Sequence, residues 1–187
     1  MTAAGLRKEY SNLTNDQLKD KVYELAFTYQ KFSKSCAQSV IASLCRVMDI
    51  DNGFVQLATS FTGGHVNQTA GTCGGLIGGT IVLDYFFGRP EDKMSYRESI
   101  QENIEMLNDT LAISHQLYKK YYSEYGSILC PNIQVQLLGR HFYLWDPQDM
   151  SEFERLGGYR KRCAHVLGNT ASWVMEILIN NGTIKRE

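Results

Sequence analysis

Residues 63–79 read GGHVNQTAGTCGGLIGG, in which seven glycines surround a single cysteine, Cys73. Glycine inside a regular element costs about 0.5–1 kcal/mol relative to alanine, so a helix that keeps several glycines must gain from their small size. The apolar residues that follow, up to Phe87, lie on all sides of a helix, which is typical of a helix buried at the centre of a domain. We therefore expect a central helix over residues 72–87 that ends at the sequence GRP (88–90).

The spacing of the glycines indicates what this helix contacts. Gly74 and Gly78 are four residues apart, as are Gly75 and Gly79, so two adjacent edges of the helix lack side chains. Another helix can approach closely at such an edge, or a bound group can lie against the bare backbone. Upstream, Gly71 and its neighbours allow a tight loop whose N–H groups can point at an anion or at sulfur. A phosphate-binding loop is excluded because no Gly-Lys-Ser/Thr sequence follows.

The remaining sequence shows helical periodicity nearly throughout. The pattern predicts an all-α, single-domain bundle over residues 1–187, with a core at about 20–180 and an irregular excursion at 140–159 that holds one short helix. The segment 130–139 is ambiguous between helix and strand, because Pro131 suits a first helical turn while its apolar residues alternate. The other helices are expected from Thr14 to Phe32, with Thr14 and Gln17 forming a capping box, from Ser33 or Ser35 to Met48, from Ser95 to Tyr125, and from Tyr159 to Ile179.

The long helix over residues 95–125 carries an apolar stripe. The stripe consists of Ile100, Ile104, Leu107, Leu111, Tyr118, Tyr122 and Tyr125. We interpret it as facing the core, together with His115, which falls on the same stripe. A homodimer surface at the tyrosine-rich end, YKKYYSEY (118–125), is the alternative.

Composition excludes several classes of function. The chain has 187 residues, 43% of them hydrophobic and 21% charged, with a net charge of −1, which gives no basic footprint for nucleic acid. The most apolar run, residues 75–88, is too short to span a bilayer and contains Asp84. The N-terminus has no apolar core of the signal-peptide kind, so we expect a cytoplasmic protein without a membrane span.

Four of the five cysteines fall at the expected starts of four different helices: Cys36, Cys73, Cys130 and Cys163. A helix N-terminus carries about half a positive charge and unpaired N–H groups, which favour the thiolate that acts as nucleophile or metal ligand. Cys45 lies nine residues after Cys36 and so on the opposite face of its helix. Spacing alone is a weak metal signal, because the chain has no CxxC pair.

These segments resemble a known family. SCAQSVIASL (35–44), FTGG (61–64), TCGGLIGG (72–79), GSILC (126–130) and RCAHV (162–166) occur in the order of the small redox-active proteins named for their C…GCAxxG…C…C pattern. The resemblance covers roughly residues 20–180 and implies a helical domain with a redox or iron–sulfur role. Its four family cysteines match Cys36, Cys73, Cys130 and Cys163, and Cys45 has no counterpart. Ser35 stands where glycine is common, and Gly75 replaces a usual alanine.

The first hypothesis for function is a four-thiolate metal site. The four cysteines at the helix starts would ligate an iron–sulfur cluster, and N–H groups around Gly71, Gly74 and Gly75 would tune it. Zinc is an alternative metal. The second hypothesis is a metal-free thiol–disulfide oxidoreductase, in which two of the four cysteines cycle between dithiol and disulfide. Cys73 and Cys36 are the candidate catalytic residues. Both hypotheses imply a redox partner protein or a small-molecule substrate.

Two further hypotheses belong to other classes. Cys73 could be the nucleophile of a hydrolase or transferase, with His65 as its base. Alternatively, the chain could be a non-catalytic interaction module that uses its tyrosine-rich helix end. Whether the protein is an enzyme stays open at this stage; if it is one, it is oxidoreductase-like.

Overall fold

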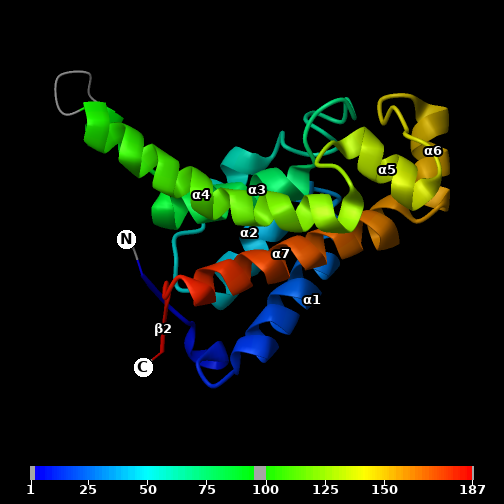
Figure 1. Cartoon of the computed structure of the whole chain (residues 1–187). Helices are drawn as coiled ribbons and strands as arrows, with labels where there is room; N and C mark the ends of the chain where they lie inside the picture. Colours follow the sequence, from blue (N-terminus) through cyan, green and yellow to red (C-terminus); the bar gives the residue numbers. More distant parts are fainter. Residues whose placement is uncertain (1–2, 95–99, 187) are drawn as a thin grey trace.

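Helices form nearly all the regular structure in the computed structural model, which describes residues 3–94 and 100–186 (Figure 1). This architecture confirms the all-α class. The helices are α1 (Asn15–Ser33), α2 (Cys36–Val47), α3 (Gly74–Phe87), α4 (Ile100–Tyr125), α5 (Cys130–Leu138), α6 (Pro147–Arg155) and α7 (Cys163–Asn180). Shorter helical turns cover Lys8–Tyr10, Gly53–Ala58, Glu91–Met94 and Gly158–Arg162. Two short strands, β1 (Ala4–Gly5) and β2 (Ile184–Lys185), pair in parallel.

Local sequence signals fix where the helices begin and end. The hydroxyl of Thr14 accepts a hydrogen bond from the Gln17 amide at 3.2 Å, and the Gln17 side chain accepts one from the Thr14 amide at 2.9 Å. The predicted capping box of α1 is therefore confirmed. The ambiguous segment after Cys130 is a helix, with Pro131 in its first turn and Gly139 closing it in a left-handed conformation (φ 85°).

The two central helices are α3 and α7. Helix α7 packs against α1, α2, α3 and α4, and α3 packs against α2, α4 and α7. A Cβ atom added at Gly78 would lie 2.8 Å from the Cα atom of Ala37 in α2, and one added at Gly79 would lie 2.7 Å from the Leu117 side chain in α4. Both bare edges of α3 are thus occupied by neighbouring helices, as the glycine spacing predicts. The predicted buried, glycine-rich central helix is confirmed.

The prediction for the buried face of α4 is wrong. Ile104, Leu111 and Tyr122 are 44%, 55% and 57% exposed, and His115 is exposed as well. Helix α4 instead buries a neighbouring face, which includes Thr110, Leu117 and Tyr121, and of the predicted stripe Tyr125 is buried as expected. The reason is its place at the edge of the bundle, where only one narrow face contacts α3 and α7 (Figure 1). Its expected first turn, from Ser95, lies outside the described residues.

Helix α1 shows a smaller deviation from its predicted stripe. Leu18 and Val22 are fully buried as expected, but Phe32 is 75% exposed. Ala26 and Gln30 are buried in its place, because the inward face continues at intervals of four residues.

The excursion after α5 has a small hydrophobic cluster of its own. Asp146 caps α6 by accepting hydrogen bonds from the amides of Gln148 and Asp149, which confirms one short helix in this segment. The cluster consists of Phe142, Leu144, Phe153 and Tyr159. It packs against Leu138 at the end of α5 and against Cys163 at the start of α7. Within residues 3–94 and 100–186, no helix has both the length and the apolar character needed to cross a membrane.

Candidate redox site

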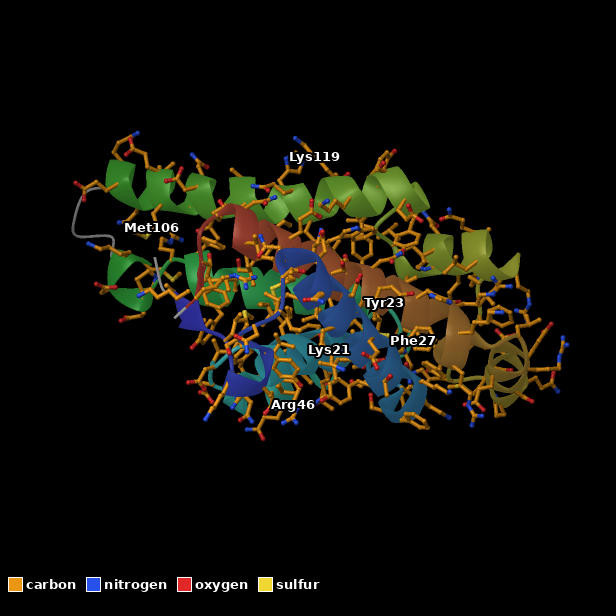
Figure 2. The ribbon with its side chains drawn as sticks, turned by 90° about the horizontal axis from the view of Figure 1, so that it is seen from below. Lys21, Tyr23, Phe27, Arg46, Met106 and Lys119 are labelled. Atoms are coloured by element: carbon orange, nitrogen blue, oxygen red, sulfur yellow. The ribbon has the colours of Figure 1, made fainter. Side chains whose placement is uncertain are left out.

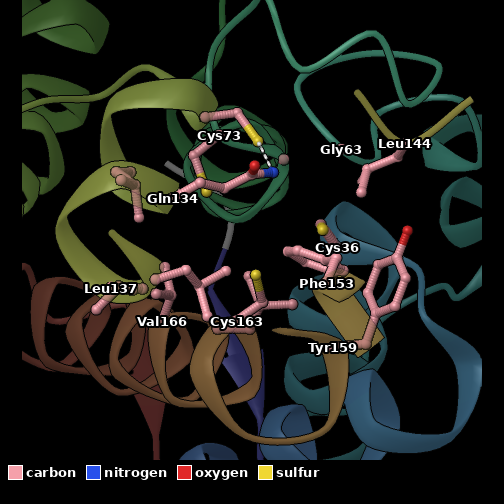
Figure 3. Close-up of a pocket in the computed structure, with 15 residues that line it drawn as sticks. Cys36, Gly63, Cys73, Gln134, Leu137, Leu144, Phe153, Tyr159, Cys163 and Val166 are labelled. Atoms are coloured by element: carbon pink, nitrogen blue, oxygen red, sulfur yellow. Dashed lines mark hydrogen bonds between the residues drawn. The ribbon is translucent and has the colours of Figure 1, made fainter. Parts of the chain in front are cut away.

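The four cysteines at the helix starts line one cavity (Figure 3). Cys36, Cys130 and Cys163 are the first residues of α2, α5 and α7, and Cys73 is the N-cap of α3. The cavity is small, about 20 Å³, and its wall is almost wholly apolar. The side chains of Ile133, Leu137, Leu138, Leu144, Phe153, Tyr159, Val166 and Leu167 contribute to this wall. The structure therefore brings together every cysteine of the predicted site. All four thiols are free.

Backbone hydrogen bonds hold the starts of α3 and α5 together. The Cys73 amide donates to the Ile128 carbonyl at 2.8 Å, and the Cys130 amide donates to the Gly71 carbonyl at 2.9 Å. Two cysteines far apart in sequence thus enter the cavity from one short antiparallel pairing. The Ala37 amide, beside Cys36, donates in turn to a carbonyl in the loop that precedes α3.

That loop has an unusual conformation. His65, Val66 and Asn67 have φ values of 74°, 41° and 59°, so they continue a left-handed turn begun by Gly63 and Gly64. Left-handed φ is unfavourable for residues with a side chain, above all for β-branched valine. A Cβ atom at Gly64 would lie 2.8 Å from the Cβ atom of Cys130, so the loop backbone contacts the site directly.

The roles expected of the three site glycines differ in the structure. The Gly71 amide is expected from the sequence to point at a cysteine sulfur. It instead donates a hydrogen bond to the Gly64 carbonyl at 3.1 Å. Gly74 acts through its missing side chain, because a Cβ atom there would lie 2.7 Å from the Cβ atom of Cys36. The backbone amides of Gly75 and Leu76, in the first turn of α3, lower the pKa of the Cys73 thiol, but Cys73 forms no side-chain capping hydrogen bond to this turn.

Polar side chains also reach the sulfur atoms. The amide nitrogen of Gln30 donates to the Cys36 sulfur at 3.7 Å, and the Thr62 hydroxyl lies 3.5 Å from the same atom. The amide nitrogen of Gln134 donates to the Cys130 sulfur at 3.5 Å, the bond drawn as a dashed line in Figure 3. Sequence reasoning missed all three side chains. Only Gln134 leaves a local signal, since it follows Cys130 by one helical turn.

Burial controls the ionisation of the thiols. It raises the pKa of Cys73 to about 11 and also raises the pKa of Cys130 and of Cys163 well above the ordinary thiol value, with repulsion between the clustered cysteines as the next cause. Loss of hydration in the apolar cavity therefore outweighs the stabilisation of a thiolate expected at a helix N-terminus. At neutral pH the metal-free site holds these three groups as neutral thiols.

Two other candidate residues lie apart from this arrangement. Cys45 is buried and its thiol donates to the Asp51 carbonyl at 3.6 Å, and it does not line the cavity. His65 is exposed and its ring stacks on Phe61, with 5.4 Å between ring centroids. A buried thiol with a raised pKa and an exposed imidazole lack the features of an activated nucleophile and its base.

The arrangement of donors also bears on metal binding. Thiolates are the usual protein ligands of iron–sulfur clusters and of structural zinc, so the chemistry of the four side chains fits a metal site. Among the described residues, however, no three histidine, cysteine, aspartate or glutamate side chains are placed to hold one metal ion.

Fold and site together define a small helical protein built around four cysteines in an apolar cavity. The chain belongs to the family whose model is described as "Putative redox-active protein (C_GCAxxG_C_C)", which matches residues 34–177 and so includes all four of these cysteines. This match confirms the resemblance read from the sequence. A search of curated proteins and a search of solved structures each found no match.

Proposed function

We propose that this redox-active protein ligates an iron–sulfur cluster through Cys36, Cys73, Cys130 and Cys163, and that it serves in electron transfer or reductive chemistry. The observation that carries the proposal is the convergence of four thiols, from four helix starts, on one apolar cavity. Burial of a cluster in such surroundings limits water access, which is one of the factors that set a reduction potential.

The residues around the sulfurs support this assignment. Gln30 donates a hydrogen bond to the Cys36 sulfur, and Gln134 donates one to the Cys130 sulfur. Such bonds stabilise negative charge on sulfur and are a known means of tuning cluster potential. Because the free thiols have raised pKa values, loading a metal must release protons, so we expect loading to become less favourable as the pH falls.

The positions of the cysteines in the sequence favour a cluster over a structural zinc ion. Structural zinc sites commonly use closely spaced ligand pairs, whereas the chain has no CxxC pair. No three candidate ligands in the described part of the chain are arranged for one ion. We therefore rank zinc below iron–sulfur.

A metal-free dithiol site is the second candidate, and the four free thiols lining one cavity support it. In that case two thiols would lose two protons and two electrons to form a disulfide, and the electrons would pass to a redox partner protein or a small molecule. The identity of this partner, an oxidoreductase activity and a cytoplasmic location stay predictions.

The test is anaerobic purification followed by an absorption spectrum and by iron and sulfide quantitation. We expect a brown protein with stoichiometric iron and sulfide. Cys73→Ser should lose the colour, and Cys45→Ser is the matched control that should keep it, because Cys45 is also buried but lies outside the cavity. A wild-type protein that stays colourless after reconstitution with iron and sulfide would overturn the cluster. Loss of two free thiols on mild oxidation would then support the dithiol candidate.

A further inference from the structure

Helix α4 presents an unpartnered apolar stripe to solvent. The stripe consists of Ile104, Leu107, Leu111, His115, Tyr118 and Tyr122, all exposed. They recur at intervals of three and four residues, so they form one continuous band about 27 Å long. No described segment of the chain covers it. A stripe of this kind is ordinarily buried against another helix, and an exposed apolar surface of this extent marks an interaction site.

The stripe borders a groove between α3 and α4. The groove has a volume of about 520 Å³, and Leu76 and Thr80 of α3 form its other side. Leu111 and Tyr118 belong to both the stripe and the groove. A helix laid along the stripe would therefore contact α3 as well as α4.

The charged residues beside the stripe indicate which partner binds there. Glu105 and Lys119 are both exposed and are 14 residues apart, which is two heptads, so they lie along the same edge of the stripe. Lys119 points away from the body of the bundle in Figure 2. If two copies of α4 pair antiparallel about a two-fold axis near Ala112, Glu105 of each copy lies opposite Lys119 of the other. A two-fold interface requires this self-complementarity, in which residue i meets j and j meets i.

The apolar residues match in the same register. The aliphatic side chains occupy the first half of the stripe, at Ile104 and Leu107, and the aromatic rings of Tyr118 and Tyr122 occupy the second half. Antiparallel pairing sets Ile104 of one copy between Tyr118 and Tyr122 of the other. Leu111 lies next to the axis, beside Leu111 of the second copy.

We propose that the protein forms a homodimer in which two α4 helices pair antiparallel along this stripe, with a Glu105–Lys119 ion pair on either side of the axis. The proposal does not depend on the content of the cysteine site. Because the groove lies beside α3, whose N-terminus carries Cys73, such a dimer would hold two redox sites in one particle.

The first test is sedimentation of the full chain over a range of concentrations. We expect a dimer for the wild type and a monomer for Leu111→Glu, which places two like charges together at the axis. Leu57→Glu is the matched control, because Leu57 is 74% exposed and lies outside the stripe, and it should stay dimeric. Circular dichroism checks that each variant is folded. A wild-type monomer at all concentrations, or a dimer unaffected by Leu111→Glu, would overturn the proposal.

The second test addresses the antiparallel register. Lys119→Glu and Glu105→Lys should each weaken the dimer roughly three- to tenfold at low salt, because two symmetry-related pairs are lost at once. The double variant Glu105→Lys/Lys119→Glu should return the dissociation constant to within about twofold of the wild type, since opposite charges face each other again. Failure of the double variant to recover would overturn this register.

Discussion

The Tyr121 hydroxyl lies 2.5 Å from the Thr170 hydroxyl and 3.9 Å from the Cys73 sulfur. The Thr170 hydroxyl donates its one proton to the Val166 carbonyl at 2.7 Å, so it accepts from Tyr121. Tyr121 has then used its own proton and can only accept from the Cys73 thiol. The chain of bonds runs from the sulfur outwards and so stabilises the neutral thiol, whereas burial is the first cause of the raised pKa of Cys73.

Removal of the Tyr121 hydroxyl should destabilise the metal-free protein. We expect Tyr121→Phe to lower the free energy of unfolding by about 1 kcal/mol, because Tyr121 is fully buried while Thr170 keeps its bond to Val166. Urea denaturation measures the change. Tyr143→Phe is the control, since Tyr143 is 45% exposed, and it should change stability by less than about 0.5 kcal/mol. Equal stability of Tyr121→Phe and the wild type would show that the hydroxyl chain contributes nothing.

The sequence predicts the close packing of α3 because its cause is local. Gly78 and Gly79 leave two helix edges bare, and any neighbouring helix can use them. The positions of the four cysteines at helix starts likewise predict a shared site, and the family resemblance supports this prediction. Helix starts that share one cavity, however, depend on backbone pairing between distant segments, such as Cys73 with Ile128, which no local pattern encodes.

The sequence-based predictions that are wrong depend on tertiary structure. The periodicity of α4 predicts a stripe that needs burial, but it does not say whether the same chain or another one buries it, and Leu111 is exposed here. The charge state of the thiols could not be predicted either. The helix-terminus effect is visible in the sequence, whereas the desolvation that raises the pKa of Cys163 depends on apolar residues from α5 and from the excursion.

The contact between α2 and α3 should not tolerate a side chain at Gly78. A methyl group there would lie 2.5 Å from the carbonyl oxygen of Ala37 and 2.8 Å from its Cα atom. Both are backbone atoms, which cannot rotate away from the methyl group as a side chain can. We expect Gly78→Ala to destabilise the protein by about 2 kcal/mol, even though alanine gains up to about 1 kcal/mol in helix propensity. Because α2 begins at Cys36 and Cys73 caps α3, loading of the proposed cluster should fall too. Gly5→Ala is the control in urea denaturation, since no atom lies within 4 Å of the added methyl group.

Gln134 joins the site to the excursion through two separate bonds. Its nitrogen donates to the Cys130 sulfur at 3.5 Å, and its oxygen accepts from the buried Phe142 amide at 2.8 Å. Gln134→Leu should cost about 1–3 kcal/mol, because the Phe142 amide loses its partner, and hydrogen exchange at that amide should accelerate. Gln134→Glu should restore protection of the Phe142 amide without restoring the donor to sulfur. Unchanged exchange in Gln134→Leu would show that Phe142 finds another acceptor.

The raised thiol pKa values predict that the metal-free protein loses stability at alkaline pH. The pKa of Cys73 is about 11 in the folded protein, against 9.0 for the ordinary thiol, so between these values the unfolded chain releases its proton while the folded chain retains it. The stability contributed by the neutral thiol is complete below pH 9 and falls as the pH rises toward 11. At pH 10.5 the loss from Cys73 should be about 2 kcal/mol. Buried tyrosines also titrate in the alkaline range, so the measurement is the difference in urea midpoint between the wild type and Cys73→Ser, taken at pH 8 and at pH 10.5. The gap should narrow at the higher pH, because serine does not ionise there; a gap that stays constant would mean that Cys73 ionises in the fold as freely as in the unfolded chain.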